Sequence, residues 1–181
     1  MANIYYSKFI DFFKRHGMYD EDMFNYLRMN SFVFDFRDDN YSDFIGCFFE
    51  CDNGILKKIK LATPFIVDDV TLLINIHEYV HGIMLYKMLG KKLKLGIDWE
   101  VLPMLYEKIY MLENPTEELI QYEKMLDKRI NEDSNIEYKI GLAIRDDLIQ
   151  MYNSGKNFEQ LGKFSKRLSR KVVRNKNLLN V

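Results

Sequence analysis

Residues 70–90, VTLLINIHEYVHGIMLYKMLG, are the most informative part of the sequence. Their apolar side chains fall on nearly every side of a helix, which is typical of a helix buried in the middle of a domain. Asp68 or Asp69 can cap the first turn, and Gly90 is a common residue just after a helix. We therefore predict one long buried helix here, with the rest of the chain packed around it.

The region between residues 31 and 62 has the composition of β-strands. Residues 31–36 (SFVFDF) and 44–50 (FIGCFFE) are rich in aromatic and β-branched side chains. The turn sequence DNG at residues 52–54 separates the second of these runs from residues 55–61 (ILKKIKL). These signals predict a small antiparallel sheet of about three strands that precedes the buried helix.

Helical patterns occupy most of the remaining chain. Aromatic residues recur at helical spacing in residues 5–13, and every segment after Pro64 favours helix. Beyond the buried helix, the expected helices cover about 98–112, 115–130, 134–152 and 157 onward. The predicted fold class is α+β, mainly α, with a small antiparallel sheet followed by a helical bundle. We expect a single domain over residues 1–181, with N-terminal helices and the sheet in 1–62 and the helical part in 63–181.

The composition is that of a globular protein of ordinary domain size. The chain has 181 residues, of which 48% are hydrophobic and 29% are charged. The 26 basic and 27 acidic residues nearly cancel, so the net charge gives no sign of a nucleic-acid or membrane partner. No apolar run approaches the ~20 residues of a membrane span, no secretory signal is visible, and two cysteines exclude a disulfide scaffold. We expect a soluble, cytoplasmic protein.

The sequence His77-Glu78-Tyr79-Val80-His81 lies inside the predicted buried helix. Residues four apart lie one turn apart on the same helix face, so both imidazoles can reach one metal ion. Glu78 is close enough to hold a proton but is angled away from the metal, as in zinc hydrolases. Burying these polar groups in so apolar a helix is costly unless something satisfies them. The pattern therefore predicts a Zn²⁺ site.

A catalytic zinc site needs a third protein ligand and an open fourth position. Cys47 and Cys51 precede the motif in a predicted strand, where we expect two buried apolar thiols rather than ligands. No histidine follows His81, which leaves acidic residues as candidates. The acids that follow the motif are Asp98, Glu100, Glu107, Glu113, Glu117 and Glu118.

Two of these acids have informative surroundings. Glu100 has the apolar neighbours Trp99, Val101 and Leu102, and an acid in such surroundings needs a partner. Glu107 lies two turns further along the same helix face, where it could accept the N–H of a ligand histidine. The alternative for Glu107 is a solvated acid on the helix surface.

The HExxH motif followed by DWEVLPMLYE at residues 98–107 resembles the oligoendopeptidase F and thimet oligopeptidase family of gluzincin metallopeptidases. Those enzymes carry an acid, an apolar residue, the ligand glutamate, a nearby proline, and a second glutamate seven residues after the first. The sequence YKIG at residues 138–141 is similar to part of the C-terminal helix of that family. The resemblance covers roughly residues 60–165 and implies a zincin-like fold.

Carried over residue by residue, the resemblance implies His77, His81 and Glu100 as the ligands of Zn²⁺. It implies Glu78 as the general base toward the water that attacks the peptide bond. It also implies that Tyr138 donates a hydrogen bond to the oxyanion of the tetrahedral intermediate. From the sequence alone, three other tyrosines are also candidates for the hydrogen bond to the oxyanion: Tyr106, Tyr110 and Tyr152.

These observations predict a zinc-dependent metallopeptidase that acts on a peptide or protein substrate. The alternative is a catalytically inactive zincin-like module that binds a peptide or protein partner. Residues 55–61 could be the edge strand that pairs with an extended peptide, and Gly82 would leave open space above Glu78. The seven basic residues within 163–176 favour a solvated face on an amphipathic terminal helix.

Overall fold

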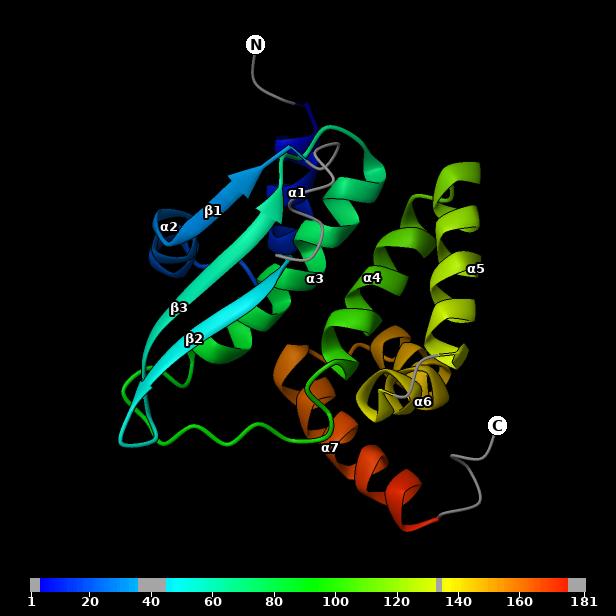
Figure 1. The fold of residues 1–181 in the computed structure, drawn as a ribbon. Coiled ribbons are helices and arrows are strands. Elements are labelled where there is room, and N and C mark those ends of the chain that lie inside the picture. Colours follow the sequence, from blue (N-terminus) through cyan, green and yellow to red (C-terminus); the bar gives the residue numbers. More distant parts are fainter. Residues whose placement is uncertain (1–3, 36–44, 133–134, 176–181) are drawn as a thin grey trace. The chain divides into compact units, whose positions relative to one another are not determined.

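The computed structural model describes residues 4–35, 45–132 and 135–175. Within these ranges the chain is α+β and mainly helical, with seven helices and one three-stranded sheet that precedes the helical part (Figure 1). The chain divides into two compact units, Met1–Lys94 and Leu95–Val181. The predicted α+β, mainly helical class is confirmed, whereas the single zincin-like domain stays a prediction.

The first unit contains the sheet and the predicted buried helix. Its elements are α1 (Ile4–Arg15), α2 (Glu21–Met29), β1 (Ser31–Phe34), β2 (Gly46–Asp52), β3 (Ile55–Pro64) and α3 (Asp69–Tyr86). α3 packs along the sheet against β3 and β2, and α1 and α2 pack against α3 as well (Figure 1). The helix that carries the HExxH motif therefore lies in the middle of this unit, as its apolar sequence predicts.

The sheet is mixed, and the prediction of an antiparallel sheet is wrong for one pair of strands. The strand order is β1-β3-β2, in which β2 and β3 form an antiparallel hairpin and β1 runs parallel to β3. The hairpin turn uses Asn53 and Gly54, both at positive φ, which fixes the antiparallel direction of the two strands it joins. No tight turn joins β1 to β3, so strand composition alone does not determine their relative direction.

The strand order also overturns two predictions about side chains and edges. β3 pairs with a strand on each side, so residues 55–61 are the central strand and not an edge. β2 is an outer strand, and its thiols are not buried: Cys51 is exposed and Cys47 is half-buried. A strand at the edge of a sheet has fewer neighbours to cover its side chains, which explains why an apolar composition misled the prediction.

Helix α3 begins with the cap that the sequence predicts. Asp68 accepts a hydrogen bond of 2.7 Å from the Thr71 N–H, and the Asp68 N–H donates to the Thr71 hydroxyl at 3.1 Å. The helix ends at Tyr86, one turn before the predicted stop. Gly90 instead adopts a positive φ and donates its N–H to the Leu56 carbonyl, which returns the chain to the sheet.

The second unit consists of four helices. They are α4 (Val101–Glu113), α5 (Glu117–Glu132), α6 (Ile136–Asn153) and α7 (Phe158–Arg174). α6 packs against the other three, and α4 also contacts α7. Pro103 lies in the first turn of α4, where its missing N–H breaks no helical hydrogen bond, and α4 starts at Val101, about three residues after the expected start. No helix in the described ranges has both the length and the apolar character that crossing a bilayer requires.

Two features fix how these helices pack. At Gly141 of α6, a Cβ atom would clash with the Met104 sulfur of α4 in its present position, so the glycine lets the two helices approach closely there. Lys108 of α4 lies 2.5 Å from Glu123 of α5, and Arg145 of α6 pairs with Asp127 of α5 at 3.0 Å. The glycine contact brings α4 and α6 close together, and the two ion pairs join each of these helices to α5.

Candidate metal centre

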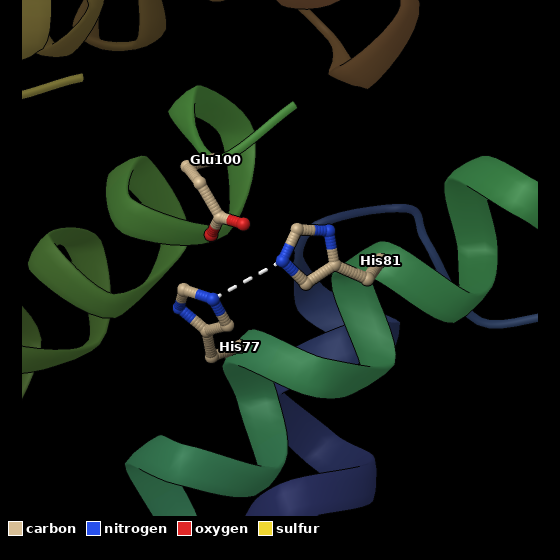
Figure 2. Close-up of side chains that lie close together, drawn as sticks. All are labelled: His77, His81 and Glu100. Atoms are coloured by element: carbon tan, nitrogen blue, oxygen red, sulfur yellow. Dashed lines mark hydrogen bonds between the residues drawn. The ribbon is translucent and has the colours of Figure 1, made fainter. Parts of the chain in front are cut away.

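Helix α3 directs two imidazoles to one point. His77 and His81 lie one turn apart, and their Nε2 atoms are 3.2 Å apart (Figure 2). Both side chains are buried, with exposed fractions of 8% and 3%. The helical spacing of four residues thus produces the convergence that the motif predicts.

Glu100 joins the two histidines. It immediately precedes α4, and its exposed fraction is 8%. Ligand atoms of His77, His81 and Glu100 all lie within 4.8 Å of one another, so the three buried residues could hold a metal ion. Figure 2 shows the two rings and the carboxylate turned toward a common position.

The donor set and its spacing fit zinc. The Nε2 atoms of His77 and His81 lie 3.2 Å apart, close enough for both nitrogens to bind one ion. Two histidines and one carboxylate are also the protein ligands of many catalytic zinc sites, which keep the fourth position for water or substrate. The identity of the ion stays a prediction, while the group that could hold it is present.

Glu78 is buried but lies outside this group of three. Its exposed fraction is 8%, and it follows His77 directly on α3. One residue corresponds to about 100° of rotation around a helix, so its carboxylate leaves the helix in a different direction from the two imidazoles. This placement agrees with a role beside the metal rather than on it.

The space around Glu78 differs from the prediction. Gly82, one turn further along α3, was expected to leave open space above the base. A Cβ atom at Gly82 would instead lie 3.0 Å from Leu27 and 3.5 Å from Leu61. The glycine therefore permits close packing of α3 against α2 and β3, and the prediction of open space is wrong.

Glu107 is buried in the second unit, with an exposed fraction of 5%. The alternative prediction, a solvated acid on the helix surface, is therefore wrong. Burial, followed by the negative charge of Glu107, raises the pKa of the nearby Tyr122 hydroxyl. A histidine N–H as the partner of Glu107 stays a prediction.

The tyrosines proposed for the oxyanion differ in their accessibility. Tyr106 and Tyr110 each have an exposed fraction of 1%, and the Tyr106 ring packs against Phe158. These two rings belong to the core of the second unit and are closed to a substrate. Tyr138, in the first turn of α6, is half-buried, and so is Tyr152 at the other end of that helix. Burial thus reduces the four candidates to two.

Within the second unit, the first turn of α6 lies near Glu100. Burial, followed by the negative charges of Glu100 and Asp98, raises the pKa of the Glu137 carboxyl. Glu137 directly precedes Tyr138, so the same turn carries the half-buried tyrosine. The close approach of α6 to α4 at Gly141 accounts for this placement.

A separate cavity lies in the first unit. Its volume is about 280 Å³, and its lining includes Phe9, Ile66 and Tyr79. Tyr79 lies two residues from His77, about 200° around α3. The cavity therefore opens on the other side of the helix and does not include the residues that could hold a metal.

Comparisons with known proteins assign no family. No protein-family model, no curated protein and no solved structure matches this chain. The functional inference therefore depends on the motif, on the buried group of three ligands and on the residues around it.

Proposed function

We propose that this protein is a zinc-dependent metallopeptidase that hydrolyses peptide bonds. The observation that carries the proposal is the buried convergence of His77, His81 and Glu100, with Glu78 beside them in an HExxH helix. The resemblance of residues 60–165 to the gluzincin peptidases supports the same reaction. A Zn²⁺ ion held by these three residues would supply a Lewis acid that polarises the scissile carbonyl and acidifies water.

Glu78 acts as the general base in this proposal. Its carboxylate accepts a proton from the attacking water as the oxygen adds to the scissile carbonyl carbon. The resulting carboxylic acid then donates that proton to the leaving amine as the C–N bond breaks. The residue ends each turnover as a carboxylate.

Tyr138 stabilises the charge that develops on the former carbonyl oxygen. A phenol hydroxyl can donate one hydrogen bond to that oxygen, and a donor already held in place requires no reorganisation when the charge forms. The placement of the first turn of α6 near Glu100 supports this role.

The peptide substrate pairs with β2 in an extended conformation. β2 is an outer strand of the sheet against which α3 packs, and no described strand pairs with its other edge. Phe48 and Phe49, on opposite faces of β2, are 48% and 38% exposed. An outer strand with exposed aromatic side chains can add a peptide as a further strand.

The experiment compares wild type with Glu78→Gln on a mixture of unlabelled peptides, with products identified by mass spectrometry. The amide has the size of the carboxylate but cannot accept the proton, so hydrolysis should fall by about 10²-fold or more while bound zinc is retained. Glu118→Gln, the same chemical change on the exposed surface of α5, is the matched control. Zinc binding without hydrolysis in the wild type would favour the inactive peptide-binding module instead.

A further inference from the structure

Helix α7 carries a continuous row of positive charge. Six cations lie at spacings of three and four residues, which places them along one side of the helix. They are Lys163, Lys166, Arg167, Arg170, Lys171 and Arg174, here called the basic stripe. All six side chains are exposed, and no ion pair joins any of them to another residue in the described ranges.

The charge of the chain is concentrated in this segment. Seven of the 26 basic residues lie within 163–176, and no acidic residue follows Glu159. Residues 1–162 therefore hold 19 basic and 27 acidic residues, a net charge of −8. The near-neutral net charge of the chain is therefore the sum of an acidic segment, residues 1–162, and a basic C-terminal segment that contains most of α7.

The basic stripe is not required by the fold. The opposite side of α7 is buried through Leu161, Ser165, Ser169 and Val172, so the stripe itself makes no contribution to the core. Like charges three or four residues apart destabilise a helix. The favourable effect of cations at a helix C-terminus covers only Lys171 and Arg174 in the last turn. Of the other four cations, Arg167 lies over the Phe164 ring, and Lys163, Lys166 and Arg170 make no ion pair within the described ranges.

We propose that the basic stripe is a docking surface for a short acidic segment of a protein partner. The stripe extends over twelve residues of helix, a length of roughly 16 Å, which about five residues of an extended peptide would match. A run of aspartate or glutamate of that length places its carboxylates beside the six cations. The surface is distinct from the metal centre and does not depend on peptidase activity.

The distribution of charge favours a short acidic segment over a nucleic acid. A phosphate backbone continues beyond the stripe and meets the rest of the second unit, where residues 95–162 carry 7 basic and 14 acidic residues, a net charge of −7, whereas an acidic run of matching length carries its charge only where the cations are. Proteins that hold single strands also offer exposed aromatic rings for base stacking. Phe164, which lies among these cations in the sequence of α7, is half-buried, and the guanidinium of Arg167 lies over its ring.

The test measures binding of a fluorescent peptide with a run of about six glutamates, by anisotropy, to the full-length protein. A peptide with glutamines in the same positions, a single-stranded oligonucleotide and a duplex of similar length are measured beside it. Mass spectrometry of the recovered peptide shows whether it stayed intact. The variant Lys166→Gln with Arg170→Gln removes two cations one turn apart, and Lys124→Gln with Lys128→Gln removes two exposed cations at the same spacing on α5.

The glutamate peptide should bind at low salt and the glutamine peptide should not, with affinity falling as salt is added. The α7 variant should weaken binding by about fivefold, as expected for two exposed charge pairs, while the α5 variant binds like the wild type. Equal effects of the two variants, or no binding of the glutamate peptide at low salt, would overturn the proposal. Tighter binding of either oligonucleotide than of the glutamate peptide would also overturn the proposal, because it would indicate a nucleic-acid partner.

Discussion

The metal centre should stabilise the folded protein, and Glu100→Gln should remove most of that stabilisation. A ligand that binds only the folded state adds about 4.1 kcal/mol to the free energy of unfolding when its free concentration is about 1,000 times its Kd. For a chain of this length, each kcal/mol raises the melting temperature by about 2–4 °C, so zinc should raise it by about 8–16 °C. Differential scanning fluorimetry with added zinc and with chelator measures this difference.

Glu100→Gln distinguishes zinc binding from folding because it should lower stability when zinc is present but not when zinc is absent. The amide keeps the size of the carboxylate but loses the charge that binds zinc. Losing a residue that only orients a ligand weakens metal affinity by about 10–100-fold, and losing a ligand itself should cost at least the upper value. A 100-fold loss is about 2.7 kcal/mol, so the zinc-dependent shift should fall by at least about 5–11 °C.

In chelator the same variant should melt close to or above the wild type. Glu100 is buried, and a neutral amide avoids the desolvation that a buried carboxylate suffers. Glu118→Gln, on the exposed surface of α5, should behave like the wild type under both conditions. The reasoning fails if zinc leaves the wild-type melting temperature unchanged, or if Glu100→Gln keeps the full zinc-dependent shift.

Three further substitutions test other parts of the structure. Tyr138→Phe should lower kcat by about 10-fold or more at unchanged zinc content, since it removes one hydrogen-bond donor to the oxyanion; full activity would exclude this tyrosine. Gly141→Val should lower the free energy of unfolding by about 1–3 kcal/mol in urea because its side chain meets the Met104 sulfur, and Met104→Ala in the same chain should recover part of the loss. No recovery would show that the close contact is not the cause. Asp68→Ala should cost about 1 kcal/mol by removing the capping box with Thr71, and an unchanged urea midpoint would contradict it.

Local spacing explains why much of the site could be predicted from the sequence. His77 and His81 converge because α3 is helical, and the helix follows from its apolar composition and the Asp68 cap. Glu100 was one of several acids that the residues alone allowed, and its apolar neighbours together with the family resemblance singled it out. The structure adds its burial and its distance from the two imidazoles.

Most of the wrong predictions concern packing between segments that are distant in the sequence. The direction of β1 and the central position of β3 depend on which strands pair, and strand composition does not contain that information. The exposure of Cys51 follows from the outer position of β2. Gly82 faces Leu27, a residue of another helix that periodicity within α3 cannot reveal. Local patterns specify elements, while strand order and contacts between distant segments come from the assembled fold.

The most direct test of the central claim is the zinc content of the purified protein, by elemental mass spectrometry, for wild type and Glu100→Ala. The account predicts about one zinc ion per wild-type chain and clearly less in the variant, because the variant lacks one of three protein ligands. Glu118→Ala, which changes an exposed residue of α5, should match the wild type. A wild-type protein that holds no zinc, even after zinc is added back, would contradict the account.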